Sequence, residues 1–569
     1  MTLRVSSPYH PKVQPVVSAE QMRQIDRLTI EDCETPSLFL MEAAANACLQ
    51  AITSHFSGQL AGKKARILCG PGNNGGDGAA LARAFSRVGV QADVVLFGRV
   101  DNAKGDARTN FEIVRRLGIV KAGSSELSSA LSFLECDGIS AWQEIAWPGR
   151  PYDIIVDALF GTGLTRALEG VYLQVILHLV KIRLERDRSA EARPLIVSID
   201  IPSGLNADLA EPIGEAVKAD LTVTFTAPKP ANVLPPAAHF CGQLVVANIG
   251  SPSALLEAAN TRLFVTEASD ARAWLGCTRY TPDSYKNSHG HALVIAGSRD
   301  YTGAAALCGS AAMRSGAGLV TIATPASAQF AVAARTMPEV ITTALAETDR
   351  GAVSDEAIDY VMGLASTATA VAIGPGLSAD DDRTRGFVRA VIERRNSPVI
   401  IDADGLNCLA PWPRDLRGTK HAPLILTPHP GEMLRLLGAT DKSSLKDRVS
   451  ATRDFATKSE LIVVLKGSRS LIAAPDGRVF VNSTGNAGLG TAGAGDTLTG
   501  IIAGFIAQAF ATLKEQADAL SATIAALYIG GLAADLAAQK LGMRTMVASD
   551  IREHISAAVC LLDPEGEAP

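Results

Sequence analysis

Residues 490–500 read GTAGAGDTLTG, a run of small residues that leads into a long apolar segment. The residues from Thr491 to Gly495 predict a helix start whose backbone N–H groups can surround an anion. Asp496 would project from the first turn of that helix, where its carboxylate could accept the proton of an attacking hydroxyl group. An aspartate in this position can also serve only to complement the helix dipole, but that alternative leaves the preceding glycines unexplained. The pattern therefore predicts a site for phosphoryl transfer.

Short apolar runs surround this motif and predict an α/β fold in both halves of the chain. Most of them are continuously apolar, as expected of parallel strands that helices cover on both faces. In the second half, strands are expected at residues 291–296, 319–323, 371–373, 399–401, 424–426 and 461–465, with a hairpin at 471–474 and 478–482 and two long helices from about residue 495. In the first half, strands are expected at residues 65–70, 92–97, 153–160, 195–201, 221–227 and 244–249, with helices at 19–31, 37–55, 77–88 and 103–117.

The length of the chain and an interruption in this pattern predict two domains. A chain of 569 residues is longer than the roughly 250–300 residues at which single cores stop growing. The alternation breaks down after residue 250 and resumes after a polar segment at 278–289. We therefore expect a Rossmann-like, doubly wound domain at residues 1–265 and a second α/β domain at 266–569. Residues 120–150, which include Trp142 and Trp147, read as an irregular insert.

Three of the expected strands in the first half end in polar or glycine-rich segments. One leads into GPGNNGGDG (70–78), one carries Asp157 and leads into GTGLTRA (161–167), and one carries Asp200 and leads into Pro-Ser-Gly (202–204). The carboxyl ends of parallel strands lie at the same edge of a sheet, where ligands bind. The spacing G-x-G-x-x-G of a dinucleotide fingerprint is also present in the first segment, but it leaves the two asparagines unexplained.

Hard oxygen donors are available at these strand ends. Asn74, Asp157 and Ser203 suit an alkali or alkaline-earth cation better than zinc, which prefers histidine or cysteine. Alternatively, Asp157 and Asp200 cap the turns that follow them. That alternative accounts for either aspartate alone but not for three such segments together.

The composition excludes several classes of protein. The chain is 47% hydrophobic and 20% charged, with 50 glycines, as is usual for a globular α/β protein. Its net charge is −6 without a basic block, so no nucleic-acid partner is expected. The nine cysteines form no C-x-x-C pair, which argues against zinc and thioredoxin-type sites and suits reduced thiols in the cytoplasm. The first 20 residues have no apolar core and predict no signal peptide. The apolar segments 500–513 and 520–538 predict buried core helices, not membrane spans.

NNGGDG (73–78), D-x-x-x-G-T-G from Asp157, and SIDIPSG (198–204) together resemble the NAD(P)H-hydrate epimerase family, over residues 16–250. Members interconvert the R and S hydrates at C6 of the reduced nicotinamide ring. The resemblance implies a catalytic role for Asp200 and potassium bound by Asn74, Asp157 and Ser203. It also implies that the hydrate is bound by Asn73, Asn74, Gly75, Gly76, Asp77, Gly161, Thr162, Gly163, Leu164, Thr165, Arg166, Ala167 and Asp200.

The second half resembles the ribokinase-like superfamily through GAGD, and its hydrate dehydratase branch through RSGAGLV (314–320), IGPGL (373–377), DADGLN (402–407), TPHPGE (427–432) and KGS (466–468). This resemblance covers residues 280–555. It implies that the S hydrate is phosphorylated at the expense of ADP, with magnesium, and then loses phosphate. The implied nucleotide-binding residues are Lys466, Gly467, Ser468, Arg469, Ser470 and Gly495, and the implied hydrate-binding residues are Ala304 or Ala305, Gly376, His429 and the catalytic Asp496. His429, between two prolines, could instead be a turn residue.

Taken together, the two resemblances predict a fused repair enzyme for hydrated NADH and NADPH, cytoplasmic and homo-oligomeric (tetramer or larger), with no membrane partner. Two other hypotheses fit parts of the sequence. A sugar or vitamin kinase with an accessory domain would not need the three N-terminal segments. A regulatory protein with inactive sites would not need Asp157, Asp200 and Asp496.

Overall fold

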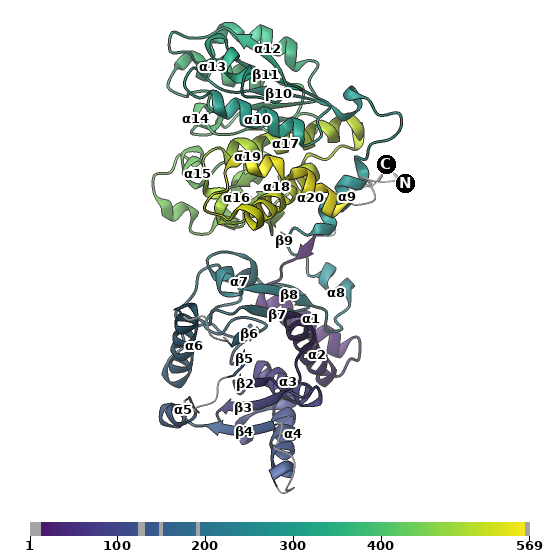
Figure 1. The fold of residues 1–569 in the computed structure, drawn as a ribbon, viewed down its shortest axis with the longest axis vertical. Coiled ribbons are helices and arrows are strands. Elements are labelled where there is room, and N and C mark those ends of the chain that lie inside the picture. Colours follow the sequence, from purple (N-terminus) through teal and green to yellow (C-terminus); the bar gives the residue numbers. More distant parts are fainter. Residues whose placement is uncertain (1–12, 123–130, 147–151, 189–193, 564–569) are drawn as a thin grey trace. The chain divides into compact units, whose positions relative to one another are not determined.

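The computed structural model describes residues 13–122, 131–146, 152–188 and 194–563. The chain divides into two compact units between Thr261 and Arg262 (Figure 1). The division precedes the expected boundary at residue 265 because strand β9 (Leu263–Val265) pairs with β18 (Val479–Val481) of the second unit.

The first unit, Pro15–Thr261, contains a seven-stranded sheet in which all pairs are parallel. Its strands are β2 (Lys64–Cys69), β3 (Gln91–Phe97), β4 (Leu131–Cys136), β5 (Ile154–Ala158), β6 (Leu195–Ile199), β7 (Leu221–Phe225) and β8 (Gln243–Ala247). The spatial order is β4-β3-β2-β5-β6-β7-β8. The order therefore reverses between β2 and β5, which creates the switch point where doubly wound sheets bind ligands.

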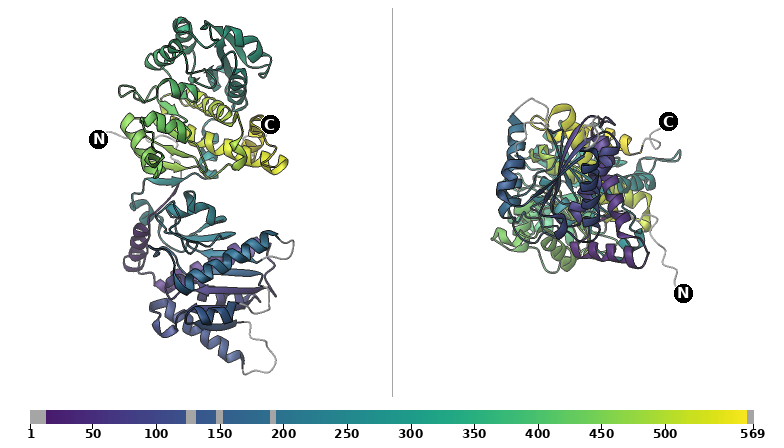
Figure 2. Two further views of the ribbon diagram at one scale, coloured as in Figure 1. Left: turned by 90° about the vertical axis from the view of Figure 1, so that its left-hand side faces the viewer. Right: turned by 90° about the horizontal axis from the view of Figure 1, so that it is seen from below.

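Helices cover both faces of this sheet, as the continuously apolar strands predicted (Figures 1 and 2). The helices are α1 (Ala19–Glu31), α2 (Ser37–His55), α3 (Asn73–Arg87), α4 (Gly105–Ala122), α5 (Ile139–Ala146), α6 (Gly170–Arg188), α7 (Pro230–Val233) and α8 (Ser253–Ala258). One buried cluster joins α2, α3 and α4 to the strands, and another joins α5 and α6 to the opposite face. The Rossmann-like prediction for the first half is confirmed.

Two local predictions in the first unit are wrong. The supposed irregular insert contains β4 and α5, whose Trp142 is buried with its ring centroid 5.4 Å from that of Phe97. β4 is an edge strand with exposed side chains, so it lacks the continuous apolar run by which the other strands were recognised. Trp147 lies outside the described residues. Helix α3 begins at Asn73, before the expected start, so NNGGDG forms its first turns.

The second unit contains an eleven-stranded sheet. Its parallel part has the order β12-β11-β10-β13-β14-β15-β16 and continues through the antiparallel pair β17 and β18 to β9 and β1. These strands are β10 (His291–Ile295), β11 (Leu319–Pro325), β12 (Ile341–Leu345), β13 (Ala370–Ile373), β14 (Val399–Ile401), β15 (Leu424–Leu426), β16 (Ile462–Leu465), β17 (Leu471–Ala473) and β1 (Gln14–Pro15). The predicted strands and the hairpin are present; β12, a half-exposed edge strand, was not recognised. The strand order reverses between β10 and β13.

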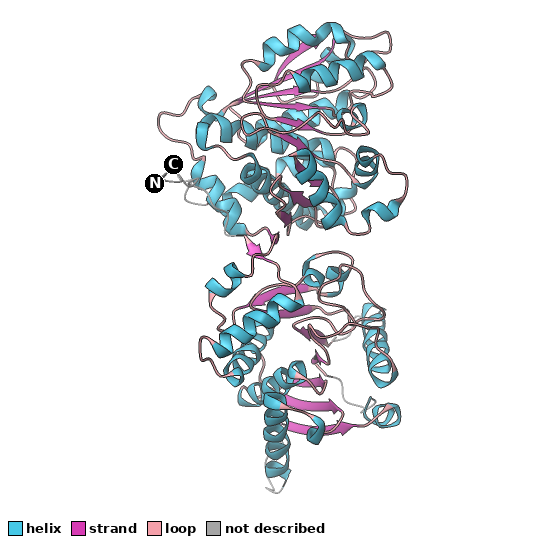
Figure 3. Cartoon of the chain, turned by 180° about the vertical axis from the view of Figure 1, so that it is seen from behind, coloured by secondary structure: helices cyan, strands magenta, loops and turns pink. Residues whose placement is uncertain are grey.

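Helices pack on both sides of this sheet as well (Figure 3). They are α9 (Ala268–Cys277), α10 (Thr302–Arg314), α11 (Ala326–Ala333), α12 (Ile358–Ala365), α13 (Asp382–Glu393), α14 (Asp404–Cys408), α15 (Pro430–Leu437), α16 (Arg448–Ser459), α17 (Ala494–Thr512), α18 (Ala519–Leu541), α19 (Ala548–Glu553) and α20 (Ile555–Leu562). Helices α17 and α18 have the length and hydropathy of membrane spans, but 72% and 78% of their apolar windows are buried inside the protein. Both belong to the core, as the sequence predicted.

Candidate active sites

A cavity of about 590 Å³ lies at the switch point of the N-terminal sheet. The predicted residues that line it are Asn73, Asn74, Asp77, Gly161, Thr162, Gly163 and Asp200. The other predicted hydrate-binding residues do not line this cavity. A Cβ on Gly75 would overlap the carbonyl oxygen of Gly70, and one on Gly76 would lie 2.8 Å from Ala107 Cα, so both glycines permit close helix packing. Leu164 is buried, and the segment Thr165, Arg166 and Ala167 is exposed beyond the cavity.

Asp157 and Ser203 are in direct contact beside this cavity. The Ser203 hydroxyl donates to Asp157 Oδ1 at 2.6 Å, and its backbone N–H donates to Oδ2 at 2.8 Å. Ser198 Oγ also donates to Oδ2 at 2.8 Å. Burial raises the pKa of Asp157, although these hydrogen bonds oppose the shift. Asp157 Oδ1 also accepts from Leu159 N at 3.3 Å, so Asp157 caps the turn that follows it, as the alternative interpretation of the sequence proposed, and also organises the turn that follows β6.

The surroundings of this pair fit a potassium ion. Phe160 contributes a carbonyl oxygen 3.3 Å from Ser203 Oγ. The side-chain amide of Asn74 lies against Gly161, and its Nδ2 is buried without a hydrogen-bond partner. A carboxylate, a hydroxyl, a carbonyl and an amide oxygen form a donor set that suits a hard cation. The unsatisfied Nδ2 is an N–H donor, so an oxygen atom of a bound substrate, and not the cation, would satisfy it.

Asp200 is paired with a lysine that the sequence analysis missed. Lys229 Nζ donates to Asp200 Oδ1 at 2.6 Å and to Thr224 Oγ1 at 2.9 Å, and its side chain is 1% exposed. Asp200 itself has φ of +65°, a strained conformation for a residue other than glycine that is common at functional sites. Lys229 follows the next strand end after Asp200, and that position was its only signal in the sequence.

Three further carboxyl groups line the cavity: Asp26 from α1, Asp77 from α3 and Asp106 from α4. Burial raises the pKa of Asp77 well above its usual value, and Asp200 and Asp26 raise it further. Burial also raises the pKa of Asp26 to about 6, a shift that Lys229 opposes and Asp200 favours. Asp26 belongs to no motif, so nothing in the sequence could have identified it.

The C-terminal site is built around the start of α17. Gly493 precedes the helix with φ of +83°, and a Cβ there would lie 2.5 Å from Leu307 Cδ1, so both conformation and space require glycine. Asp496 lies in the first turn. Burial raises its pKa to about 6, with a further contribution from Asp402 and an opposing one from Lys466. A carboxyl group with such a pKa can act as a base near neutral pH.

Lys466 lies within a set of acidic side chains beside this helix. Its Nζ donates to Asp402 Oδ1 at 2.7 Å and lies 3.8 Å from Glu432 Oε2. Burial lowers the pKa of Lys466, but Asp402 and Glu432 outweigh that effect and raise it, so the ammonium form is maintained. Thr499 Oγ1 donates to the other oxygen of Asp402 at 2.8 Å. Asp402 and Glu432 lie in the DADGLN and TPHPGE segments, but no role was predicted for either residue.

At the reversal between β10 and β13, Gly376 faces helix α10. It has φ of +65°, and a Cβ there would lie 3.0 Å from Ala304 Cβ. Ala305 is fully buried, whereas Ala304 is partly exposed. Of the two alanines left open by the sequence, Ala304 is the one beside Gly376.

His429 is both a turn residue and an accessible group. It caps α15, where its Nδ1 accepts hydrogen bonds from the N–H groups of Gly431 at 3.0 Å and Glu432 at 3.3 Å. Its side chain is 51% exposed, and Nε2 lies 3.5 Å from Glu432 Oε1. The capping role therefore leaves only Nε2 available to a ligand.

An unsatisfied arginine lies against the predicted nucleotide segment. Arg448 Nη1 donates to Ser468 O at 3.3 Å, and Nη2 lies 2.9 Å from the position that a Cβ on Gly467 would occupy. Its Nε and Nη2 are buried without hydrogen-bond partners. Arg469 has φ of +53°, and Ser470 Oγ donates to Gly467 O at 3.3 Å, so the segment forms a tight turn. Guanidinium nitrogens that are buried without a partner among the described residues are suited to an incoming phosphate.

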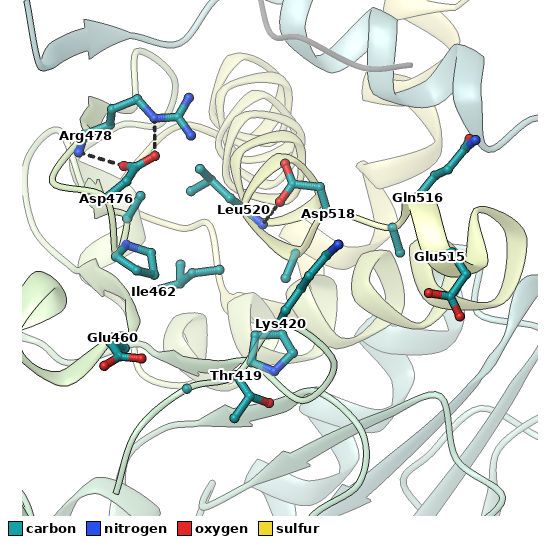
Figure 4. A pocket seen from close by; sticks show the side chains of 16 residues that line it. Thr419, Lys420, Glu460, Ile462, Asp476, Arg478, Glu515, Gln516, Asp518 and Leu520 are labelled. Atoms are coloured by element: carbon teal, nitrogen blue, oxygen red, sulfur yellow. Dashed lines mark hydrogen bonds and ion pairs between the residues drawn. The ribbon is translucent and has the colours of Figure 1, made fainter. Parts of the chain in front are cut away.

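A larger cavity, of about 770 Å³, lies elsewhere in the second unit (Figure 4). Glu460 and Ile462 line it at the amino end of β16, whereas Lys466 follows the carboxyl end of that strand. Two of its acidic side chains are already engaged: Asp476 accepts from Arg478 Nε at 2.8 Å, and Asp518 accepts from Leu520 N at 3.1 Å (Figure 4). It is therefore not the site built around Asp496.

Two doubly wound sheets, each with a reversal of strand order and with ionisable side chains clustered beyond the carboxyl ends of its strands, define a two-domain α/β enzyme with one site in each unit. Comparisons with known proteins agree. The family model described as YjeF-related protein N-terminus matches residues 37–231, and the one described as NAD(P)H-hydrate dehydratase matches residues 292–557.

Curated relatives match almost from end to end. A bifunctional NAD(P)H-hydrate repair enzyme from Moorella thermoacetica is 38% identical, over 97% of this chain and 98% of its own length. The same-named proteins of Salinibacter ruber and Escherichia coli are 36% and 32% identical, over 95% and 85% of this chain and 95% and 83% of their own. The chain belongs to the family of bifunctional NAD(P)H-hydrate repair enzymes. A solved ADP/ATP-dependent NAD(P)H-hydrate dehydratase from Bacillus subtilis, co-crystallised with ATP and Mg²⁺, is 30% identical over 52% of this chain and 97% of that chain, with a TM-score of 0.44.

Proposed function

We propose that the first unit interconverts the R and S hydrates of NADH and NADPH, and that the second dehydrates the S form at the expense of ADP, giving AMP, phosphate and NAD(P)H. The observation that carries this proposal is the presence of two separate sites: Asp200 with Lys229 beyond the strand ends of the first unit, and Asp496 at the start of α17 near Lys466 in the second. The near-complete match to relatives named as bifunctional NAD(P)H-hydrate repair enzymes supports it.

In the second unit, Asp496 would act as general base toward the C6 hydroxyl of the S hydrate. The hydroxyl oxygen attacks the β-phosphoryl group of ADP, its proton passes to Asp496, and AMP leaves. The C6–O bond then breaks as C5 loses a proton, so that phosphate departs and the C5–C6 double bond is restored. The N–H groups at the start of α17, with Gly495 and Lys466, would stabilise the charge of the transferred group.

The remaining predicted residues would position the two substrates. Lys466, Gly467, Ser468, Arg469 and Ser470 would hold the nucleotide phosphates, together with Arg448, whose unsatisfied donors support this placement. Ala304, Gly376 and the Nε2 atom of His429 would contact the hydrate. Magnesium would neutralise phosphate charge, and the carboxylate of Asp402 is a donor of the type that it prefers.

In the first unit, Asp200 would exchange protons with the C6 hydroxyl while Lys229 holds its carboxylate in place. Asn73, Asn74, Asp77 and the Gly161–Gly163 turn line the cavity and would bind the hydrate. Potassium, bound by Asn74, Asp157 and Ser203, would supply a positive charge that fixes these turns.

We also propose a cytoplasmic homo-oligomer, a tetramer or larger. All nine cysteines are free thiols, which suits a reducing compartment. Phe330 on α11 is 83% exposed and Ile341 on edge strand β12 is 52% exposed, and an apolar edge of this kind favours assembly. Sedimentation analysis tests the oligomeric state.

The function is tested by adding the protein to chemically hydrated NADH with ADP. Absorbance of the reduced ring should return in full with ADP present. Without ADP, only the ratio of R to S hydrate, measured by chromatography, should change. A protein that restores no absorbance and leaves the ratio of a purified hydrate unchanged would contradict the proposal.

A further inference from the structure

Helix α1 contributes one carboxyl group, Asp26, to the N-terminal cavity. Its Oδ1 atom is buried and has no hydrogen-bond partner within the part of the chain that the structure describes. Asp77 from α3, Asp200 after β6 and Lys229 before α7 line the same cavity. A buried carboxyl oxygen that faces a cavity without a partner is free to bond to whatever occupies it.

The cations near this cluster are already engaged. Lys229 Nζ has three protons and donates to Asp200 Oδ1, Thr224 Oγ1 and Phe225 O at 2.6, 2.9 and 3.2 Å. Arg23, which also lines the cavity, donates to Glu20 at 2.6 Å. The one buried lysine therefore neutralises the Asp200 carboxylate. Among the described residues, Asp26 has no cation of its own to balance a negative charge, and this favours the protonated form of its carboxyl group. This arrangement is consistent with the pKa of about 6 to which burial raises Asp26.

We infer that Asp26 is a second catalytic residue of the epimerase, acting with Asp200 as a pair that donates and accepts the proton of the C6 hydroxyl. The inference rests on the function proposed for the first unit. The Asp26 carboxyl gives its proton to the hydroxyl oxygen, the C6–O bond breaks, and water leaves. The N1 lone pair forms an N1=C6 double bond, and the positive charge is balanced by the Asp26 carboxylate. Water then adds to the opposite face of C6 and loses a proton to Asp200, and proton exchange between the two carboxyls restores the starting state.

The test uses the full chain with Asp26→Asn, which keeps the shape of the side chain and removes its proton. Interconversion of a purified S hydrate, measured without ADP, should fall by roughly 10²–10⁴-fold. Dehydration with ADP in the same protein should be unchanged. Asp32→Asn, an exposed carboxylate at the end of the same helix, is the matched control and should epimerise at the wild-type rate.

The pH profile separates proton transfer from a merely structural role. The donor is active when protonated, so the wild-type rate should fall as pH rises through about 6, the pKa of Asp26. Asp26→Asn should lose this slope. The ionisable groups that line the cavity with Asp26 are Arg23, Asp77, Asp106, Asp200 and Lys229. Two more lie on neighbouring helices. They are Cys48 on α2, whose pKa is raised by the charges of Asp77 and Asp200, and Glu257 on α8.

Asp26→Glu retains a carboxyl group and should recover part of the rate. A wild-type rate in Asp26→Asn, an unchanged pH slope, or a Glu variant as slow as the Asn variant would each overturn the inference. A wild-type protein that does not epimerise at all would instead contradict the proposed function.

Discussion

The two sites lie beyond the carboxyl ends of two sheets whose parallel parts have the same strand order, yet the sites are built from different groups. At the N-terminal site, the Asp200 carboxylate is neutralised by Lys229, and three more carboxyl groups line a cavity of about 590 Å³. At the C-terminal site, Gly493 precedes a helix whose Gly495 lies beside Lys466, and the unsatisfied nitrogens of Arg448 lie against Gly467. The first is equipped to move protons and the second to bind phosphate. One scaffold can therefore support both epimerisation and dehydration of the hydrate when the residues beyond its strand ends differ.

This contrast predicts that each site can be disabled without affecting the other. Asp496→Asn should produce the largest effect, because it removes the base and preserves the N–H groups that bind phosphate. Dehydration should fall by roughly 10²–10⁴-fold, while ADP affinity, measured by calorimetry, and epimerisation stay at wild-type values. If the variant dehydrates the hydrate at a rate within a few-fold of the wild-type rate, Asp496 only complements the helix dipole and is not the base.

The pH dependence of the wild type provides a second test of Asp496. A general base is active when it is deprotonated, and burial raises the pKa of Asp496 to about 6. Dehydration should therefore accelerate as pH rises through about 6 and level off above it, the opposite slope to that expected for epimerisation. Equal slopes for the two activities would contradict the contrast between the sites.

Arg448→Met tests the phosphate-binding character of the C-terminal site. A hydrogen bond to a charged group is worth about 1.5–3 kcal/mol, so the KM for ADP should rise by roughly 10–100-fold. Arg453→Met, in the same helix, removes a guanidinium group that donates to Gly477 O at 3.0 Å and should leave the KM unchanged. Equal KM values in the two variants would exclude Arg448 from the nucleotide site.

Replacing potassium with tetramethylammonium should have a smaller effect, confined to the N-terminal site. Epimerisation should slow by about 10-fold, which corresponds to about 1.4 kcal/mol, because Asn74, Asp157 and Ser203 would lose their shared ion. Dehydration should not change. Asp157→Asn should make epimerisation insensitive to the cation. If the wild type epimerises at equal rates in both salts, potassium has no role in epimerisation.

The smallest effect is expected when the two units are separated. A chain that ends at Thr261 contains every residue assigned to the N-terminal site, so it should epimerise at the full-length rate without nucleotide. Chromatography of the two hydrates measures that rate. If this chain folds but is inactive, the site must include residues of the second unit.

The sequence predicted residues that belong to compact motifs better than those that the fold brings in from outside. Asp157, Asp200 and Asp496 each follow a continuous apolar strand or a glycine run, and each lies at a strand or helix end as expected. Asp26 and Lys229 are joined to Asp200 only by tertiary structure. Arg448 likewise reaches Ser468 across 20 residues of sequence. No local pattern marks such residues.

The same distinction applies to the fold. Buried parallel strands were predicted because both of their faces are apolar. Edge strands β4 and β12 were missed because one of their faces is exposed, and β9 was assigned to the wrong domain because three residues carry too little pattern.

We propose that two independent sites act in sequence on one substrate. The most direct test gives the Asp200→Asn and Asp496→Asn variants a mixture of R and S hydrates with ADP. Asp200→Asn should restore absorbance only for the S fraction and then stop at the slow rate of spontaneous epimerisation. Asp496→Asn should equilibrate the two hydrates and restore almost no absorbance, and a mixture of both variants should restore all of it. If Asp200→Asn consumes both hydrates at the wild-type rate, or if the mixed variants leave the R form behind, the division of labour between the two units is wrong.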